Sequence, residues 1–350
     1  MRSRTTAIAL AVCAVIFCTG CGSEKRKTYE QAGKDLEQGS YEYALQGYAV
    51  CVENGTKLPE SYRGAGLADF RMGNYEQAIV NFTNALNCEK VGKSLRKDIL
   101  AYRCTAYYKS GMYTEAMADC QTLAEEFEMD SDTYFLTGKV ALAMDGYDEA
   151  ALNFEQAYGE EPTYDTAIRI YQAYLEKDME ADGTRYLEAA LQTEPEDAED
   201  YCDRGRVYYY MEDYENARKE LIEASNENST EAYLLLGMVY LAQKDVSNAK
   251  AMYQQYISEV GDSARGYNGL AMCDIAQGDY DSALSNIASG ISSANTEEMQ
   301  SLMFNEIVAY EKKLDFDTAR QKAQEYLEMF PEDAAAAKEL SFLRSRTGNS

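Results

Sequence analysis

The chain has 350 residues, and its 60 Asp and Glu outnumber its 33 Lys and Arg to give a formal net charge of −27. This acidic balance argues against a free-standing nucleic-acid-binding protein, which needs basic side chains to neutralise phosphates. Histidine, the commonest general base and metal ligand, is absent, and no motif points to catalytic, cofactor-binding or metal-binding residues. With only 4 prolines and 23 glycines, long helices are expected in place of many turns.

The first twenty residues are predicted to form an export signal. Two arginines precede an apolar run, AIALAVCAVIF from Ala7 to Phe17, and small residues follow it. This is the order of regions in a secretory signal peptide, and the run is short for a membrane span. The segment CTGC, which ends at Cys21, resembles a bacterial lipobox. The resemblance implies cleavage after Gly20 and attachment of a lipid such as palmitate to Cys21. An ordinary cleaved signal and an uncleaved anchor are the alternatives.

Residues 21–27 are expected to tether the folded part to the membrane. The segment is polar and, when fully extended, would reach about 25 Å. Its three cations, Lys25, Arg26 and Lys27, would favour anionic lipid headgroups by around 1 kcal/mol each near the surface. A soluble spacer is the simpler interpretation. The lipid would hold the protein at the cell membrane, on its extracytoplasmic face.

From Thr28 to Thr347 the chain repeats a pattern of small and aromatic residues. A small residue recurs nine times, at intervals of 32 to 38 residues, at Ala44, Ala78, Ala116, Ala150, Gly183, Ala217, Ala249, Ala283 and Ala319. In seven of the nine units an aromatic residue stands three positions earlier, and in seven a small residue stands twelve positions earlier. Small residues let two antiparallel helices cross closely. The aromatic residue is expected to fill the space between one helix pair and the next.

This period and pattern resemble tetratricopeptide repeats over residues 28–347. The resemblance implies an all-α fold, an α-solenoid of about nine helix–turn–helix units in a single elongated domain. Residues 333–346, DAAAAKELSFLRSR, are expected to form a C-terminal capping helix. The fifth unit, residues 164–197, departs most from the pattern, with Tyr171 where a small residue is expected and Gly183 where alanine is expected. It is interpreted as distorted or as a hinge.

The resemblance also implies a partner-binding groove. In tetratricopeptide proteins the first helix of each unit lines a concave face, and positions 2, 5, 9, 12 and 13 commonly meet the ligand. Carried over residue by residue, these positions give cations and aromatic rings at Arg63, Phe70, Arg71, Tyr108, Lys109, Phe135, Lys139, Arg206, Tyr209 and Tyr210. Such a surface would suit an acidic peptide segment. Scattered surface charges and contacts between repeats are the alternative interpretation.

Farther along the chain the same groove positions are apolar. They are occupied by Leu234, Met238, Leu241, Met272, Ile275, Phe304 and Val308. A groove that changes from basic and aromatic to apolar would suit an extended or helical partner with matching polarity.

Six cysteines lie in the repeat region, and no two of them form a CxxC motif. A metal cluster or redox motif is therefore not indicated. Cys51, Cys104 and Cys120 occupy small or apolar repeat positions, so buried thiols that pack as small hydrophobes are the first expectation. Cys104 and Cys120 could also face each other within one helix pair, and export would permit a disulfide between them.

The interval between the second and third units is longer than most, and residues 90–97, KVGKSLRK, contain four cations and no acidic residue. We expect a solvated connector, and a docking loop is the alternative. Gly92 to Ser94 also matches the end of a phosphate-binding loop, but Asn87 stands where the first glycine of that loop must be.

Together these observations favour a lipid-anchored, extracytoplasmic scaffold that binds protein or peptide segments in its groove and organises a membrane-associated complex. Tetratricopeptide lipoproteins of similar plan serve outer-membrane barrel assembly and type IV pilus biogenesis. Capture of a small ligand, such as a sugar or a peptide, for a transporter is the alternative. A carboxylate-based glycosidase would need a catalytic segment, and no long stretch lies outside the repeats, so the chain is not expected to be an enzyme.

Overall fold

The structure, a computed structural model, describes residues 23–330 and 333–347, without the side chains of residues 23, 296 and 297. The predicted signal peptide and Cys21 lie outside these residues. The described part contains helices and no strand. The helices are α1 (Ser23–Glu37), α2 (Tyr41–Glu53), α3 (Leu58–Arg71), α4 (Tyr75–Leu86), α5 (Lys93–Lys109), α6 (Tyr113–Glu126), α7 (Ser131–Ala143), α8 (Tyr147–Glu160), α9 (Tyr164–Leu175), α10 (Glu180–Ala190), α11 (Ala198–Tyr210), α12 (Tyr214–Asn226), α13 (Glu231–Ala242), α14 (Val246–Val260), α15 (Ala264–Gln277), α16 (Tyr280–Ile291), α17 (Thr296–Lys312), α18 (Phe316–Met329) and α19 (Ala334–Thr347).

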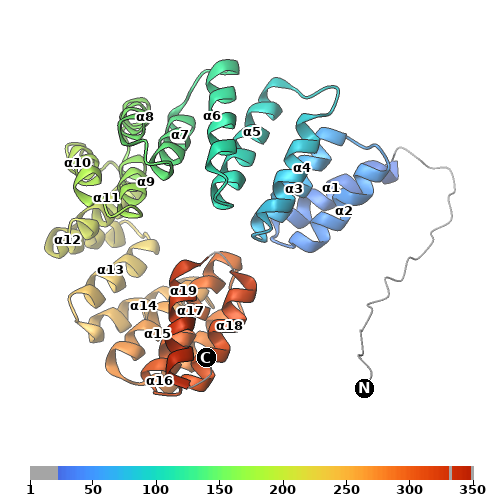
Figure 1. The fold of residues 1–350 in the computed structure, drawn as a ribbon. Helices are drawn as coiled ribbons and strands as arrows, with labels where there is room; N and C mark the ends of the chain where they lie inside the picture. The colour runs from blue at the N-terminus through green and yellow to red at the C-terminus, as the bar shows by residue number, and fades with distance from the viewer. Residues whose placement is uncertain (1–22, 331–332, 348–350) are drawn as a thin grey trace, which may run out of the picture.

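These helices form nine consecutive pairs followed by α19, and each pair packs on the next. Figure 1 shows the pairs stacked in chain order along a curved path from α1 to α19. The last helix, α19, covers the final pair with Leu340 and Leu343, which join the buried cluster of α17 and α18. The predicted all-α solenoid of nine units with a C-terminal capping helix is therefore confirmed.

The turn inside each pair has the same backbone conformation in all nine units. Five positions before the recurring small residue, φ is positive: glycine stands there in four units, and Asp145, Asp178, Glu212, Lys244 and Leu314 stand there in the others. This left-handed conformation ends the first helix and lets the chain reverse. In four units the second helix then begins after an aspartate whose side chain accepts a hydrogen bond from a backbone N–H three residues on, at Asp213, Asp245, Asp279 and Asp315.

The core of each unit forms where its two helices cross. In four units a glycine of the first helix faces a large side chain sixteen residues later: Gly66 with Phe82, Gly138 with Phe154, Gly205 with Leu221, and Gly237 with Tyr253. A Cβ atom added to any of these glycines would come within 2.8 Å of the facing side chain, which is closer than atoms pack. The close helix crossing predicted from the small residues is thus confirmed.

The aromatic residues that begin the second helices meet the expectation only in part. Tyr113 and Tyr147 remain 36% and 49% exposed. Three members of the set, Tyr75, Tyr113 and Tyr214, pack against an aromatic ring near the end of the first helix of their own unit. Tyr113 and Tyr147 therefore do not fill the space between helix pairs, whereas the half-buried Tyr41 and Tyr214 pack against clusters that include side chains of the next unit. Buried side chains from the middle of the second helix, such as Phe154, also contact the next pair.

The fifth unit, α9 and α10, exchanges the usual sizes of two facing positions. A Cβ atom on Gly183 would lie 2.9 Å from Cα of Tyr171, so the missing side chain makes room for the larger residue opposite. Tyr171 is 3% exposed and belongs to a buried cluster that runs from α7 to α11. Packed side chains therefore run through the unit that was interpreted as distorted or as a hinge.

The first helix begins earlier than expected. α1 starts at Ser23, so residues 25–27 of the predicted tether lie in its first turns. There Arg26 pairs with Glu30 one turn later, at 2.6 Å. Straight-chain charged residues favour helix, and a pair four residues apart supports it. Within the described residues, no helix has both the length and the apolar character that crossing a membrane requires.

The basic connector between the second and third units is partly helical. α5 begins at Lys93, so the second half of KVGKSLRK lies in its first two turns. Arg96 pairs with Glu126 of α6, and Lys97 pairs with Asp130 at the start of α7, both at 2.6 Å. The expected solvated connector is therefore confined to the residues before α5, because carboxylates of the following helices draw the later cations onto the stack.

Candidate functional site

All ten residues predicted to line the groove lie on first helices of their units. They come from α3 (Arg63, Phe70, Arg71), α5 (Tyr108, Lys109), α7 (Phe135, Lys139) and α11 (Arg206, Tyr209, Tyr210). The first helices contact one another in order, α3 with α5, α5 with α7, α7 with α9 and α9 with α11. The residues therefore share one side of the stack, but they extend along it and do not form a single compact site.

Three of the five predicted cations are already paired with carboxylates, Arg63 with Asp98, Lys139 with Glu176, and Arg206 with Asp203. The pair of Arg63 is bidentate, with N···O distances of 2.6 and 2.9 Å. The first two pairs link the first helix of one unit to that of the next. The positive charge of all three is partly compensated within the protein, so these residues offer less attraction to an acidic partner.

The other two predicted cations are exposed. Arg71 and Lys109 are the last residues of α3 and α5, and both side chains are open to solvent. Neither forms an ion pair with a residue in the part of the chain that the structure describes. Their charges are available to a partner. We call the part of the face formed by α3 and α5, where these two residues lie, the basic end.

The predicted aromatic residues of the groove pack mostly against the protein itself. The ammonium of Lys139 lies 5.2 Å from the ring centroid of Tyr108, and the guanidinium of Arg169 lies 4.4 Å from that of Phe135. The hydroxyl of Tyr210 accepts a hydrogen bond from the side-chain amide of Gln172 at 2.5 Å. Tyr108, Phe135 and Tyr210 therefore each have a cation or an amide of the protein as a neighbour, and Phe70 packs against Tyr75 and Tyr102.

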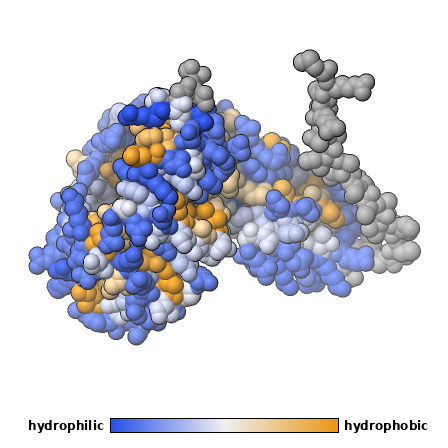
Figure 2. Space-filling view, turned by 90° about the horizontal axis from the view of Figure 1, so that it is seen from below, coloured by the Kyte–Doolittle hydropathy of each residue, from blue (hydrophilic) through white to orange (hydrophobic). Residues whose placement is uncertain are grey.

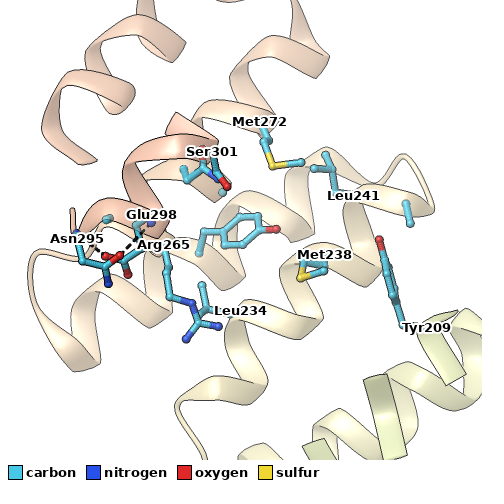
Figure 3. Close-up of a pocket in the computed structure, with 14 residues that line it drawn as sticks. Tyr209, Leu234, Met238, Leu241, Arg265, Met272, Asn295, Glu298 and Ser301 are labelled. Carbon is cyan, nitrogen blue, oxygen red and sulfur yellow. Dashed lines mark hydrogen bonds between the residues drawn. The ribbon is translucent and has the colours of Figure 1, made fainter. Parts of the chain in front are cut away.

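A recess lies farther along the stack, where α11, α13, α15 and α17 adjoin. It encloses about 800 Å³ and is lined by Tyr209, Leu234, Met238, Leu241, Ala242, Tyr253, Ala264, Arg265, Asn268, Gly269, Met272, Asn295, Glu298 and Ser301. We call it the pocket. Figure 3 shows Tyr209, Leu241, Met238 and Met272 on one side of it and Arg265, Asn295 and Glu298 on the other. The pocket thus has an apolar wall and a polar end, the usual composition of a ligand-binding site.

Two methionines form the exposed part of the apolar wall. Met238 and Met272 occupy the same position in successive units, and they are 38% and 40% exposed. Most of the surface in Figure 2 is hydrophilic, and apolar side chains appear there as separate patches. Methionine is unbranched and polarizable, so such a wall adapts to differently shaped apolar side chains.

One tyrosine ring that lines the pocket is held between two glycines. Tyr253 of α14 is 3% exposed. A Cβ atom on Gly237 or on Gly269 would lie 2.6 or 2.3 Å from its ring, so the ring fits closely between α13 and α15. Burial raises the pKa of the Tyr253 hydroxyl well above its usual value, and the ring is uncharged at neutral pH. Adding a side chain at either glycine would force this ring to move.

The polar end of the pocket is held by hydrogen bonds within the protein. Arg265 makes two hydrogen bonds to Glu231, at 2.5 and 2.8 Å. Asn268 accepts a hydrogen bond from the side-chain amide of Asn305 at 2.8 Å. Glu298 lies at the start of α17, where its side chain accepts a backbone N–H. These contacts fix the orientation of groups that could recognise the backbone of a bound segment.

The sequence pattern indicated only part of this pocket. It placed Leu234, Met238, Leu241 and Met272 on an apolar stretch of the groove. It did not indicate Tyr253, which comes from a second helix, or the polar end, which comes from the starts of α15 and α17. The glycines at 237 and 269 were a usable signal, because both face the same ring. Among the described residues no group of three or more Cys, Asp or Glu is arranged to hold a metal ion. The arrangement is suited to binding.

The fold is an α-solenoid of nine helix pairs whose arrangement is that of tetratricopeptide repeats. Residues 202–264 and 234–288 match the family model described as Tetratricopeptide repeat. The matched stretch contains α13, α15 and most of the residues that line the pocket.

Similar proteins are known among curated sequences. The BBSome complex member BBS4 homolog of Drosophila melanogaster is 22% identical over 261 residues, which are 73% of this chain and 48% of that protein. The Hsp70-Hsp90 organizing protein of Triticum aestivum is 26% identical over 179 residues, which are 48% of this chain and 29% of that protein. The chain thus spans less than half the length of the curated relatives it matches.

Two solved structures are also similar. A tetratricopeptide repeat protein from Parabacteroides merdae ATCC 43184 has 17% identity and a TM-score of 0.47, and the alignment covers 72% of this chain and 99% of that chain. Yeast Tom70 has 11% identity and a TM-score of 0.42, with 93% of this chain and 89% of that chain covered.

Proposed function

We propose that this protein is a lipid-anchored, extracytoplasmic tetratricopeptide scaffold that holds a segment of a protein partner and organises a membrane-associated complex. The observation that carries the proposal is the pocket, in which Met238 and Met272 remain exposed beside Leu241 and Tyr209. Apolar side chains that gather in a recess of an otherwise hydrophilic surface mark an interaction site. We assign the pocket a binding role and no reaction.

The names of two similar proteins support assembly with other proteins. One is named as a member of the BBSome complex, and the other is named for organizing Hsp70 and Hsp90. Both names describe proteins that act by assembling with protein partners, which is the activity we propose for this chain.

The partner segment is proposed to be apolar where it enters the pocket and acidic where it passes the basic end of the face. Apolar side chains of the segment would lie against the two methionines. Acidic side chains would meet Arg71 and Lys109, the two predicted cations that form no ion pair with a described residue. Because exposed ion pairs contribute little free energy, the pocket is expected to supply most of the affinity.

A crosslinking experiment tests the pocket. A photoreactive amino acid at position 241, in native membranes, should capture a protein that mass spectrometry identifies. Met238→Glu with Met272→Glu should reduce capture at least tenfold, because a carboxylate in the apolar wall must be desolvated. Met329→Glu is the matched control, since Met329 is 51% exposed on α18, outside the pocket. Equal capture by the double variant and the control would contradict the proposal.

The acidic part of the partner is tested separately. Arg71→Glu and Lys109→Glu should weaken capture severalfold and make it less sensitive to salt, because screened long-range attraction is lost. The helical content should not change, since both side chains are exposed. Tighter binding by the charge-reversed variants would show that the segment at this end is not acidic.

The lipid anchor has its own test. The wild-type chain, grown with an alkyne analogue of palmitate, should become labelled and remain in the membrane fraction. Cys21→Ser should lose both the label and the membrane association, because one or two acyl chains supply the anchoring free energy. Undiminished labelling of Cys21→Ser would exclude this cysteine as the lipidation site.

The volume of the pocket also favours a second candidate function, capture of a small ligand for a transporter. A cavity of about 800 Å³ is within the range of pockets that enclose small molecules. Calorimetric titration against panels of sugars and short peptides separates the two functions. Saturable binding of one such compound, lost in Met238→Glu, would favour ligand capture over a protein partner.

A further inference from the structure

The third unit differs from all the others at the point where its two helices cross. The crossing pairs of the other units are Ala32 with Tyr48, Gly66 with Phe82, Gly138 with Phe154, Tyr171 with Leu187, Gly205 with Leu221, Gly237 with Tyr253, Ala271 with Ile287 and Ile307 with Ala323. In the third unit, α5 and α6, both members of the pair are cysteine, at Cys104 and Cys120. The repeat geometry itself therefore brings these two side chains together.

The two cysteines meet in the core. Their sulfur atoms lie 3.2 Å apart, and the residues are 0% and 1% exposed. Each of the other crossings has at least one residue larger than cysteine, and in four of them a large side chain extends over a glycine. Two cysteines bring less apolar volume to the same place. A covalent bond between them would hold α5 against α6 where this packing is reduced.

We propose that Cys104 and Cys120 form a disulfide bond that joins the two helices of the third unit. This inference rests on the proposed extracytoplasmic location, because thiols in the cytosol are kept reduced. The oxidant is a disulfide of the thiol–disulfide oxidoreductase class. Since both sulfur atoms are buried in the folded unit, the bond forms as the chain folds or when the unit opens locally.

The two thiols are oxidised by two successive thiol–disulfide exchanges. The thiolate of one cysteine attacks the disulfide of the oxidant, one sulfur of the oxidant leaves as a thiolate, and a mixed disulfide remains. The thiolate of the second cysteine then attacks the sulfur of the first cysteine in the mixed disulfide and releases the other sulfur of the oxidant as a thiolate. Two electrons pass to the oxidant, which takes up the two protons lost by the cysteines and becomes a dithiol.

The other four cysteines of the repeat region provide internal controls. Cys51, Cys88, Cys202 and Cys273 lie in different units and make no sulfur–sulfur contact with a described cysteine. The thiol of Cys88 donates to a backbone carbonyl of α4, the preceding helix, and the sulfur of Cys202 lies 3.2 Å from the hydroxyl of Ser229. All four are expected to stay reduced under conditions in which Cys104 and Cys120 are joined.

Peptide mapping of the full-length chain tests the bond. The protein is extracted from membranes under acid quench, unfolded, alkylated, digested without reductant and measured by mass spectrometry. The expected result is a linked peptide containing Cys104 and Cys120, with the four control cysteines alkylated. In Cys104→Ser the peptide of Cys120 should become alkylated. If Cys104 and Cys120 are both alkylated in the wild type, even after incubation of the extracted protein with oxidised glutathione, the inference is overturned.

The same experiment distinguishes the bond from the location. A linked peptide that forms with oxidised glutathione, but is absent when the cells are quenched, leaves the disulfide site standing and contradicts the extracytoplasmic location. Alkylation of both cysteines under both conditions overturns the disulfide and says nothing against the location, which the Cys21→Ser experiment tests.

A packing variant tests the structural role of the bond. Reduction of the wild-type chain should lower Tm by about 5 °C, as expected for opening a loop of this length. Cys104→Gly with Cys120→Phe recreates the crossing of the second and fourth units and should fold with a Tm that does not depend on reductant. A wild-type Tm that is the same before and after reduction would overturn the proposed stabilising role.

Discussion

At the residue scale, the turn inside each unit makes the same conformational demand nine times. Leu314, which occupies the turn of the ninth unit, has a φ of 65° and a side chain that is 73% exposed. A leucine in this left-handed conformation is strained, because its Cβ crowds the following carbonyl oxygen. Its side chain makes little compensating contact, whereas four other units have glycine at this position.

Replacing Leu314 by glycine should therefore stabilise the protein. We expect Leu314→Gly to raise the free energy of unfolding by about 1 kcal/mol, after the greater entropy of glycine in the unfolded chain is counted. Urea denaturation monitored by circular dichroism measures the change. Gly111→Ala, the reverse exchange at the turn of the third unit (φ 70°), is expected to lower the same quantity by about 1 kcal/mol. A loss of stability in Leu314→Gly would show that leucine is not strained there.

Asp203 of α11 carries a half-buried carboxyl group. Burial raises the pKa of Asp203 to about 6, against the opposing effect of Arg206 beside it. A free aspartate has a pKa of about 4, so between these values the folded chain keeps a proton that the unfolded chain has lost. The stability that this group contributes is complete below pH 4 and is lost as the pH rises through 6.

Asp203→Asn removes the titrating group and keeps a side-chain oxygen that can accept a hydrogen bond from Arg206. At pH 8 the variant should be more stable than the wild type by about 1 kcal/mol, and near pH 4 the difference should vanish. Urea midpoints measured at both pH values provide the comparison. A difference between the two proteins that did not change with pH would contradict the raised pKa.

At the element scale, the second helix of most units packs on the first helix of the next, whereas the fifth unit meets the sixth mainly through its first helix, α9. Phe154 of α8 is fully buried, with its ring 5.8 Å from Phe135 of α7 and 5.1 Å from Tyr174 of α9. It thus contacts both its own unit and the following one. Leu152, two residues earlier on the same helix, is 60% exposed.

This contrast gives a prediction for α8. Phe154→Ala should lower the free energy of unfolding by about 4 kcal/mol, because it removes buried apolar contact and leaves a cavity between two units. Leu152→Ala is the control on the same helix and should change it by less than about 0.5 kcal/mol. Chemical denaturation of both variants measures the two effects, and equal changes would show that α8 does not join the units through its buried face.

At the scale of the whole molecule, each helix pair packs mainly on its immediate neighbours in the chain. The stability of such a stack is approximately a sum of unit and interface terms. Damage at one end should therefore remain local. The C-terminal end offers a matched pair of positions on α19, where Leu343 is fully buried and Phe342 is 38% exposed.

We expect Leu343→Asp to open the C-terminal end of the stack. Because an unpaired carboxylate would be buried against α17 and α18, amide hydrogen exchange should speed up in α17 to α19 and stay unchanged in α3 to α8. Phe342→Asp should leave both regions unchanged. Faster exchange throughout the chain in Leu343→Asp would mean that the nine units unfold as one cooperative block.

The sequence alone predicts the repeat, the number of units, the first helices that carry the groove residues, and the capping helix. It could do so because small residues at fixed intervals and the 3.6-residue period of a helix are local properties of the chain. It also indicated that Cys104 and Cys120 could face each other, because all units share one geometry. The signal peptide and the lipidation of Cys21 stay predictions.

Only the tertiary structure decided which groove residues are available to a partner. Arg63 is paired with Asp98, which is thirty-five residues away, and no local pattern indicates such a pairing. The pocket likewise depends on Tyr253 from a second helix fitting between two glycines on different first helices. Charge compensation and cavity shape arise between neighbouring units, from residues that are not adjacent in sequence, so they follow from how the pairs stack and not from the composition of any one of them.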